Sequence, residues 1–180
     1  LRKFISWKFQ AFGKLTFITG IHQMNERYNQ NRTLEPRFAM NWELNPTIDL
    51  TLGYGKHSTM ESVHNYFAKV PNEQGKLTEP NRNLGLLKAE HYTLAIEKRF
   101  QPDLKAKLGL YYQWLYDLPV ANEDTSYYAT INERIDYEYV DLINEGNGKN
   151  YGVELTIEKV FNDSYYFLIN MSLFQSKYKT

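Results

Sequence analysis

Two histidines, His57 and His64, flank a loop that contains aromatic residues, and they are the first candidates in this sequence for binding chemistry. Neutral imidazole is a common ligand of zinc, copper and iron. The spacing of the two histidines matches none of the usual zinc patterns, and no third ligand is obvious. The alternative is that both are structural or solvent-facing. We therefore keep His57 and His64 as candidate ligand-binding residues and predict no metal site.

Two adjacent tyrosines, Tyr127 and Tyr128, lie in a second polar stretch and could contact a ligand. A tyrosine ring offers a flat apolar face and a polar tip, so it could stack on a sugar or an aromatic group. The alternative is an ordinary loop surface. These two residues complete the set of candidate ligand-binding positions.

The same stretch is acidic and could hold calcium or a cationic ligand. It lacks the glycine-centred spacing of a calcium-binding loop, so a solvated acidic surface is the competing interpretation. The carboxylates are those of Glu123, Asp124, Asp136, Glu138 and Asp141.

Several functions find no support in the composition or the motifs. Net charge is zero, so the sequence carries no basic footprint for nucleic acid. Cysteine is absent, which excludes disulfide scaffolds and thiol catalysis. No nucleophile–base pair, phosphate-binding loop or paired-carboxylate site stands out. We predict neither a catalytic site nor a cofactor, and do not expect an enzyme.

The elements that must position these residues follow a repeated unit of strand, tight turn, strand and long polar loop. In 88–100, Tyr92, Leu94 and Ile96 alternate with polar residues, and 104–118 alternates in the same way. Successive side chains of a strand point to opposite faces, so each segment has one apolar and one polar face. The eight predicted strands are 3–12, 15–22, 34–44, 48–55, 88–100, 104–118, 153–158 and 165–178.

The strand lengths and the aromatic content predict membrane-spanning strands. Ordinary strands have about 5–6 residues, whereas a tilted membrane-spanning strand needs roughly 9–11. Aromatic residues are 16% of the chain, and tyrosine is the commonest of them, which suits an interfacial girdle. The predicted fold class is all-β, with about eight antiparallel up-and-down transmembrane strands. A complete small outer-membrane barrel and a soluble β-sandwich binding module remain the alternatives.

The connections predict which ends of the strands lie outside the cell. Short turns at 13–14, 45–47, 101–103 and 162–164 alternate with longer loops at 23–33, 58–87 and 119–149. In outer-membrane barrels the short turns are periplasmic and the long loops extracellular. Both chain ends would then lie on the loop side. We therefore expect residues 1–180 to be one partial barrel domain, part of a larger barrel, with no plug domain among them.

Several segments resemble the barrel of TonB-dependent receptors of the Bacteroidota type. The resemblance covers about residues 34–180. Its motifs are Leu34-Glu35-Pro36-Arg37-Phe38, 52–58, 111–120, 144–155 and 172–178.

That resemblance implies a barrel of about 22 strands that encloses an N-terminal plug, and uptake driven by TonB. The parent protein would take up a nutrient such as a siderophore, a glycan or a peptide across the Gram-negative outer membrane. The implied partners are outer-membrane lipid, the remainder of the barrel and its plug, TonB acting through the parent protein, and a possible surface lipoprotein. The resemblance leaves the transported ligand open.

Overall fold

Eight long strands form one antiparallel sheet in the computed structural model, which describes residues 1–123, 125–132, 140–162 and 165–179. The strands have between 10 and 21 residues. They are β1 (Arg2–Ala11), β2 (Leu15–Asn25), β3 (Arg32–Asn45), β4 (Ile48–Thr59), β7 (Leu87–Gln101), β8 (Leu104–Ala121), β9 (Leu142–Asn162) and β10 (Tyr165–Lys179). The predicted eight strands in four hairpins are confirmed.

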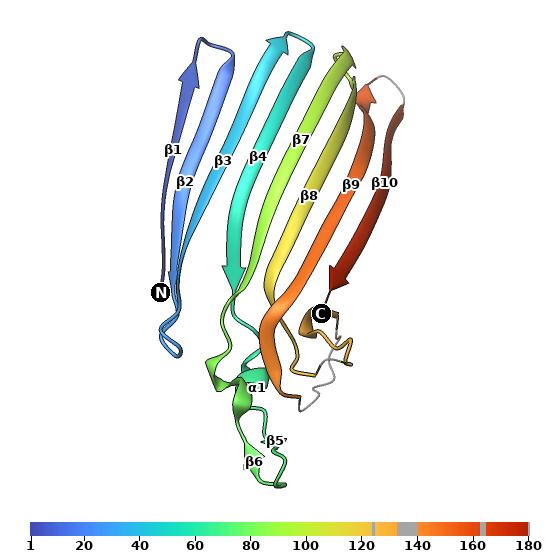
Figure 1. Ribbon diagram of the computed structural model, residues 1–180. Helices are drawn as coiled ribbons and strands as arrows, with labels where there is room; N and C mark the ends of the chain where they lie inside the picture. Colours follow the sequence, from blue (N-terminus) through green and yellow to red (C-terminus); the bar gives the residue numbers. More distant parts are fainter. Residues whose placement is uncertain (124, 133–139, 163–164, 180) are drawn as a thin grey trace.

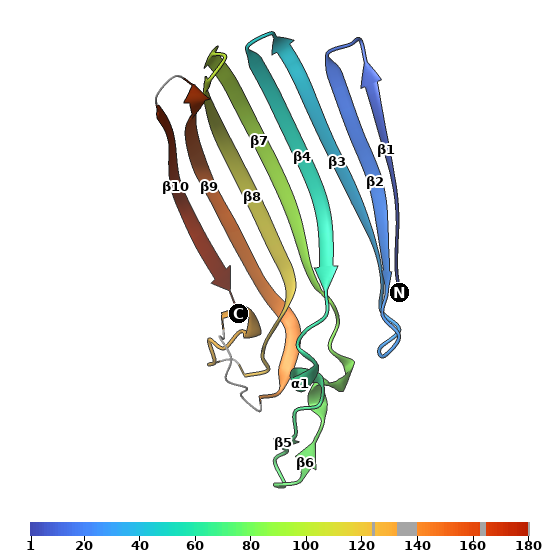
Figure 2. The same cartoon turned by 180° about the vertical axis from the view of Figure 1, so that it is seen from behind.

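Neighbours in the sheet follow chain order, β1-β2-β3-β4-β7-β8-β9-β10. Figures 1 and 2 show an open curved sheet with β1 at one edge and β10 at the other. Within the described residues these two strands do not pair with each other, so the sheet does not close into an eight-stranded barrel. The short turns that join β1 to β2, β3 to β4 and β7 to β8 lie at one end, and the longer connections lie at the other end, near both ends of the chain (Figure 1).

One connection that we expected to be long is short. Because β2 continues to Asn25 and β3 begins at Arg32, only residues 26–31 join them, instead of the predicted 23–33. Polar side chains at the ends of both strands pair across the ladder, for example His22 opposite Glu35. The predicted loop 119–149 shrinks for a related reason, since β8 and β9 continue to pair as far as Ala121 and Leu142.

The connection between β4 and β7 carries its own small elements at the loop end of the sheet (Figure 1). A further short helix, η2 (Thr130–Asn132), lies in the connection between β8 and β9. The elements between β4 and β7 are α1 (Val63–Tyr66), a two-stranded sheet of β5 (Val70–Pro71) and β6 (Leu77–Thr78), and η1 (Pro80–Asn83). Among the described residues no helix has the length and hydrophobicity needed to cross a membrane.

One face of the sheet is apolar along rows that cross the strands in register. Ile96 lies opposite Leu50 and Leu108, and the row continues through Leu155 to Met171. The predicted apolar stripe therefore falls on one face. Its members stay well exposed, with Leu108 at 44%, because no second layer covers the sheet in the described structure. A sandwich would bury this face against another sheet, so that alternative does not fit.

A tyrosine row crosses the same face nearer the loop end. Tyr54, Tyr92, Tyr112 and Tyr151 lie opposite one another on successive strands. Their ring centroids are separated by 5.1, 6.3 and 6.4 Å. Rows of this kind are typical of the aromatic girdle at a membrane interface.

Candidate functional site

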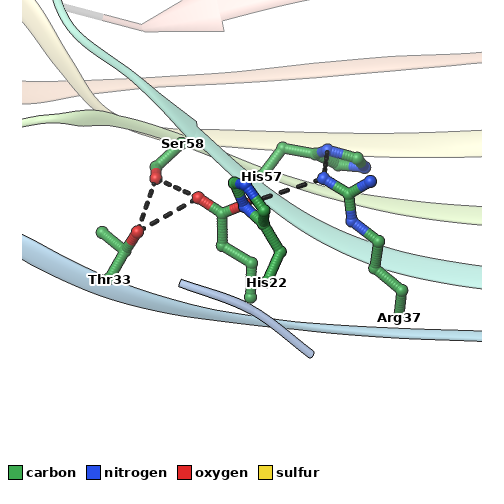
Figure 3. A network of polar contacts seen from close by, with 6 residues as sticks. His22, Thr33, Arg37, His57 and Ser58 are labelled. Atoms are coloured by element: carbon green, nitrogen blue, oxygen red, sulfur yellow. Dashed lines mark hydrogen bonds and ion pairs between the residues drawn. The ribbon is translucent and has the colours of Figure 1, made fainter. Parts of the chain in front are cut away.

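The polar face carries a belt of hydrogen-bonding side chains near the loop end. We call this set the polar belt, and Figure 3 shows its β2–β4 part. Side chains two residues apart on a strand share a face, so in-register strands bring their polar residues side by side. The belt consists of His22 on β2, Glu35 and Arg37 on β3, His57 on β4, His91 on β7, Gln113 on β8 and Asn150 on β9.

Glu35 is the anchor of the belt on β3 and is only 1% exposed. Its Oε2 lies 2.6 Å from His22 Nδ1 and 3.7 Å from a guanidinium nitrogen of Arg37. The hydroxyls of Thr33 and Ser58 donate to Oε1 (Figure 3). A buried carboxylate is costly unless its charge is paired and its oxygens accept hydrogen bonds, and here both conditions hold. Glu35 thus fixes the positions of the belt residues around it.

His57 connects this cluster to the strands beyond β4. Arg37 Nη2 lies 3.2 Å from His57 Nδ1. A guanidinium can only donate, so His57 Nδ1 is the acceptor and its ring proton lies on Nε2. The rings of His57 and His91 meet edge to face at 4.8 Å. Such a neutral tautomer suits two imidazoles and a guanidinium that lie this close together.

The belt ends in two amide side chains. Gln113 Nε2 lies 2.9 Å from His91 Nε2, and Gln113 Oε1 accepts from Asn150 Nδ2 at 2.7 Å. The amide of Gln113 therefore donates to one neighbour and accepts from the other, which fixes the direction of the chain of hydrogen bonds. A continuous polar strip thus crosses the sheet from β2 to β9.

A hollow of about 740 Å³ lies beside the belt, and its charged lining is positive. Arg2 and Arg37 contribute the cations, three belt histidines also line the hollow, and among the described residues no carboxylate belongs to the lining. Glycines keep the floor open, since a Cβ at Gly55 would come within 2.9 Å of His57 Nε2. This is a volume and a charge that suit an anionic group.

The loops beside the belt form a compact cap with its own small core. Tyr66, Leu84 and Leu142 are at most 5% exposed and pack with Tyr128 and Val140. Burial raises the pKa of the Tyr66 hydroxyl above its usual value. These residues come from 60–86 and from 122–142, so the cap holds the two longer connections together.

Comparison with known proteins identifies the family. The sequence matches, over residues 4–179, the family model described as TonB dependent receptor-like, beta-barrel. This chain belongs to that family. Its members are transporters and receptors of the Gram-negative outer membrane, and the segment is a piece of such a barrel. No curated protein sequence matches the chain.

Solved structures show the same fold in TonB-dependent receptors. The siderophore receptor PirA from Pseudomonas aeruginosa matches with a TM-score of 0.74 at 12% identity, over 98% of this chain and 35% of PirA. The outer membrane transporter YddB from Escherichia coli matches with a TM-score of 0.73 at 14% identity, over 98% of this chain and 24% of YddB. The FrpB iron transporter from Neisseria meningitidis matches with a TM-score of 0.65 at 12% identity, over 98% of this chain and 25% of FrpB. The chain therefore spans about a quarter to a third of these proteins.

The receptor barrel places the two candidate histidines in different settings. His57 lies in the polar belt, where its contacts are Arg37 and His91. His64 lies in α1, within the loop cap. Across the described part of the receptor, no group of three or more histidine, aspartate or glutamate side chains is arranged to hold a metal ion.

The two candidate tyrosines of the receptor also differ in their surroundings. Tyr127 is 84% exposed, and its backbone carbonyl accepts a hydrogen bond of 3.1 Å from Tyr178. Tyr128 instead packs against the core of the cap. Tyr127 is therefore open to contact from solvent, whereas Tyr128 supports the cap.

The acidic stretch can be followed only in part. Asp124, Asp136 and Glu138 lie outside the described residues. Asp141 accepts a hydrogen bond of 2.9 Å from the amide of Asn122, which ties the end of β8 to the start of β9. The two interpretations of this stretch, a cation site and a solvated acidic surface, are therefore not tested by the described residues.

Alternation along the strands places Glu35, Arg37, His91 and Gln113 on the polar face but does not join them into a site. It does not single out His22 or Asn150. The tight turns could have revealed part of the belt. Counting back from each turn sets the register within a hairpin, and this puts His91 opposite Gln113. The register between hairpins depends on long loops, and the sequence does not give it.

Asn81 provides a test of the loop cap, because this side chain joins two connections and is only 1% exposed. Its amide donates to the Val140 carbonyl and accepts from the Leu142 amide, both at 2.8 Å. Asn81→Leu should leave these two backbone groups without their partner and weaken the cap by about 1–3 kcal/mol for each.

The measurement is hydrogen exchange of the amides in 60–86 and 140–145, in the whole receptor. The control is Asn83→Leu, at an exposed position two residues away in the same short helix η1. Equal protection in the two variants would contradict this role of Asn81.

Proposed function

We propose that this segment forms part of the wall of a TonB-dependent transporter that takes up an anionic nutrient complex. The observation that carries the proposal is the polar belt with its positively lined hollow, on the face opposite the apolar rows. In an outer-membrane barrel the outward face is apolar and the inner face polar, so the belt would face the lumen. Transport, and not catalysis, is the activity that such a wall supports.

The remaining parts of this function lie in the parent protein. A barrel of about 22 strands would supply the neighbours of β1 and β10, and its plug would contact the inner face. TonB would act through that plug, and a surface lipoprotein would cover the loops. The motifs at 34–38 and 144–155 support assignment to the Bacteroidota type.

Iron chelates are the first cargo class to test, because two of the similar structures are named as an iron transporter and a siderophore receptor. Arg37 is the belt residue best placed to meet an anionic chelate. Its side chain is 49% exposed, and it lines the hollow. Cells that lack the receptor are complemented with the whole protein and supplied with labelled ferric citrate, a ferric tris-catecholate or a neutral ferric hydroxamate.

Arg37→Gln should lower uptake of an anionic chelate about tenfold or more, because a hydrogen bond to a charged group contributes roughly 1.5–3 kcal/mol. The control is Lys107→Gln, which removes a charge from the polar face near the turn end. Equal uptake of all three chelates by cells with and without the receptor would reject iron as the cargo. Full activity of Arg37→Gln on a receptor-dependent anionic chelate would reject the role of the belt.

A further inference from the structure

A row of four charged side chains and one tryptophan crosses the apolar face just beyond the tyrosine row. The residues two positions further along each strand share the outward face and lie about 7 Å closer to the loops. They are Lys56, Glu90, Trp114, Lys149 and Lys177, opposite one another on β4, β7, β8, β9 and β10. The first charged side chains of this face therefore lie directly next to the aromatic girdle, on its loop side.

Glu90, the acidic residue of this row, already has hydrogen-bond partners. Glu90 accepts hydrogen bonds from Tyr92 at 2.8 Å and from Tyr116 at 3.5 Å. The ammonium group of Lys56 lies 5.6 Å from the centre of the Tyr116 ring. At the β4–β8 end of the row the charges and aromatic rings therefore compensate one another.

The β9–β10 end of the row is different, because two lysines face each other there. Lys149 lies directly opposite Lys177 in the β9–β10 ladder. Like charges at opposed positions destabilise a sheet unless an anion lies between them. Neither lysine forms an ion pair with a carboxylate within the described structure.

A shallow groove of about 280 Å³ lies at this position, and three lysines line it. Among the residues that the structure describes, none of those lining the groove is acidic. The other side chains include aromatic rings from the girdle level, and below them the apolar row of Leu110, Val153 and Leu173 continues across the same three strands. The residues of the groove are Tyr112, Trp114, Asn147, Gly148, Lys149, Lys177, Tyr178 and Lys179.

We propose that this groove binds the phosphorylated headgroup of a lipid in the outer leaflet. Lysine is a strong point-charge ligand for phosphate, and a basic pocket at the headgroup level suits an anionic lipid. The acyl chains would lie over the apolar row, while Trp114 and Tyr112 contact the boundary between chains and headgroup. The inference requires the apolar face to meet lipid and the loop end to face outward, and it does not depend on the cargo.

The test uses the whole receptor, purified in detergent and titrated with lipid A carrying two phosphates, with binding followed by native mass spectrometry. The double variant Lys149→Gln/Lys177→Gln should bind about 25-fold more weakly, since each lysine near an anionic surface contributes about fivefold. The control Lys98→Gln/Lys107→Gln removes the same charge elsewhere on the strands and should bind like wild type. Unchanged heat-modifiable mobility shows that each variant is folded.

Three outcomes would overturn the proposal. The first is equal binding of lipid A by the groove variant and the control variant. The second is equal binding of fully dephosphorylated lipid A by the wild type, which would mean that the groove recognises acyl chains alone. The third is displacement of lipid A by inorganic phosphate at similar concentrations, which would make the groove a site for free phosphate.

Discussion

Replacing Leu108 with arginine should destabilise the parent barrel by about 2–4 kcal/mol, the cost of a cationic side chain on the lipid face near the middle of the bilayer. Leu108 is in the apolar row between Ile96 and Leu155 and is 44% exposed. In a membrane that exposed surface would contact acyl chains, which cannot solvate a guanidinium. The measurement is the urea midpoint of the whole receptor in lipid vesicles, read from heat-modifiable mobility.

The matched control is the next residue on the same strand. Lys107 lies on the polar face, where it is opposite Glu97 and Thr156. Lys107→Leu should therefore leave the urea midpoint almost unchanged. Equal effects of the two substitutions would mean that the faces are assigned wrongly.

The second prediction concerns which ends of the strands face the outside of the cell, and its expected result is all or none. A cysteine at Asn83 or Thr125, both exposed in the loop connections, should react with membrane-impermeant biotin-maleimide on intact cells. A cysteine at Lys14 or Pro102, both exposed at the short turns, should react only after the cells are opened. The segment has no native cysteine, so it adds no background labelling. Labelling confined to the turn sites on intact cells would reverse the topology.

The sequence predicted most of the sheet because its tight turns fix the register inside each hairpin. Gly13, for example, has φ = +70°, a left-handed conformation that glycine adopts without a steric cost. From each turn outward, strict alternation assigns the faces, and this was enough to put Leu94 and Leu110 on the apolar side. The positions of all four hairpins follow from these two local signals.

The strand ends and the site depend on longer-range structure, which alternation does not encode. Pro119 looked like the end of a strand, but β8 continues beyond it through register shifts near Leu118 and Val120. A proline is tolerated in a strand at such an irregularity. His57 and His91 meet only because β4 and β7 pair across residues 60–86, and nothing local in the sequence sets that register.

The chain-order arrangement of the sheet also has a kinetic consequence. Every ladder of the eight-stranded sheet joins strands that follow one another in chain order within that sheet, so the contact order is low for an all-β sheet of this size. Each tight hairpin closes a very short loop, and the entropy cost of the longer closures rises only logarithmically with length. We expect the four hairpins to form first and to join afterwards, with the Asn81 link among the late contacts. The wall would then grow by addition of ready-made hairpins, and β1 and β10 would be the growing edges.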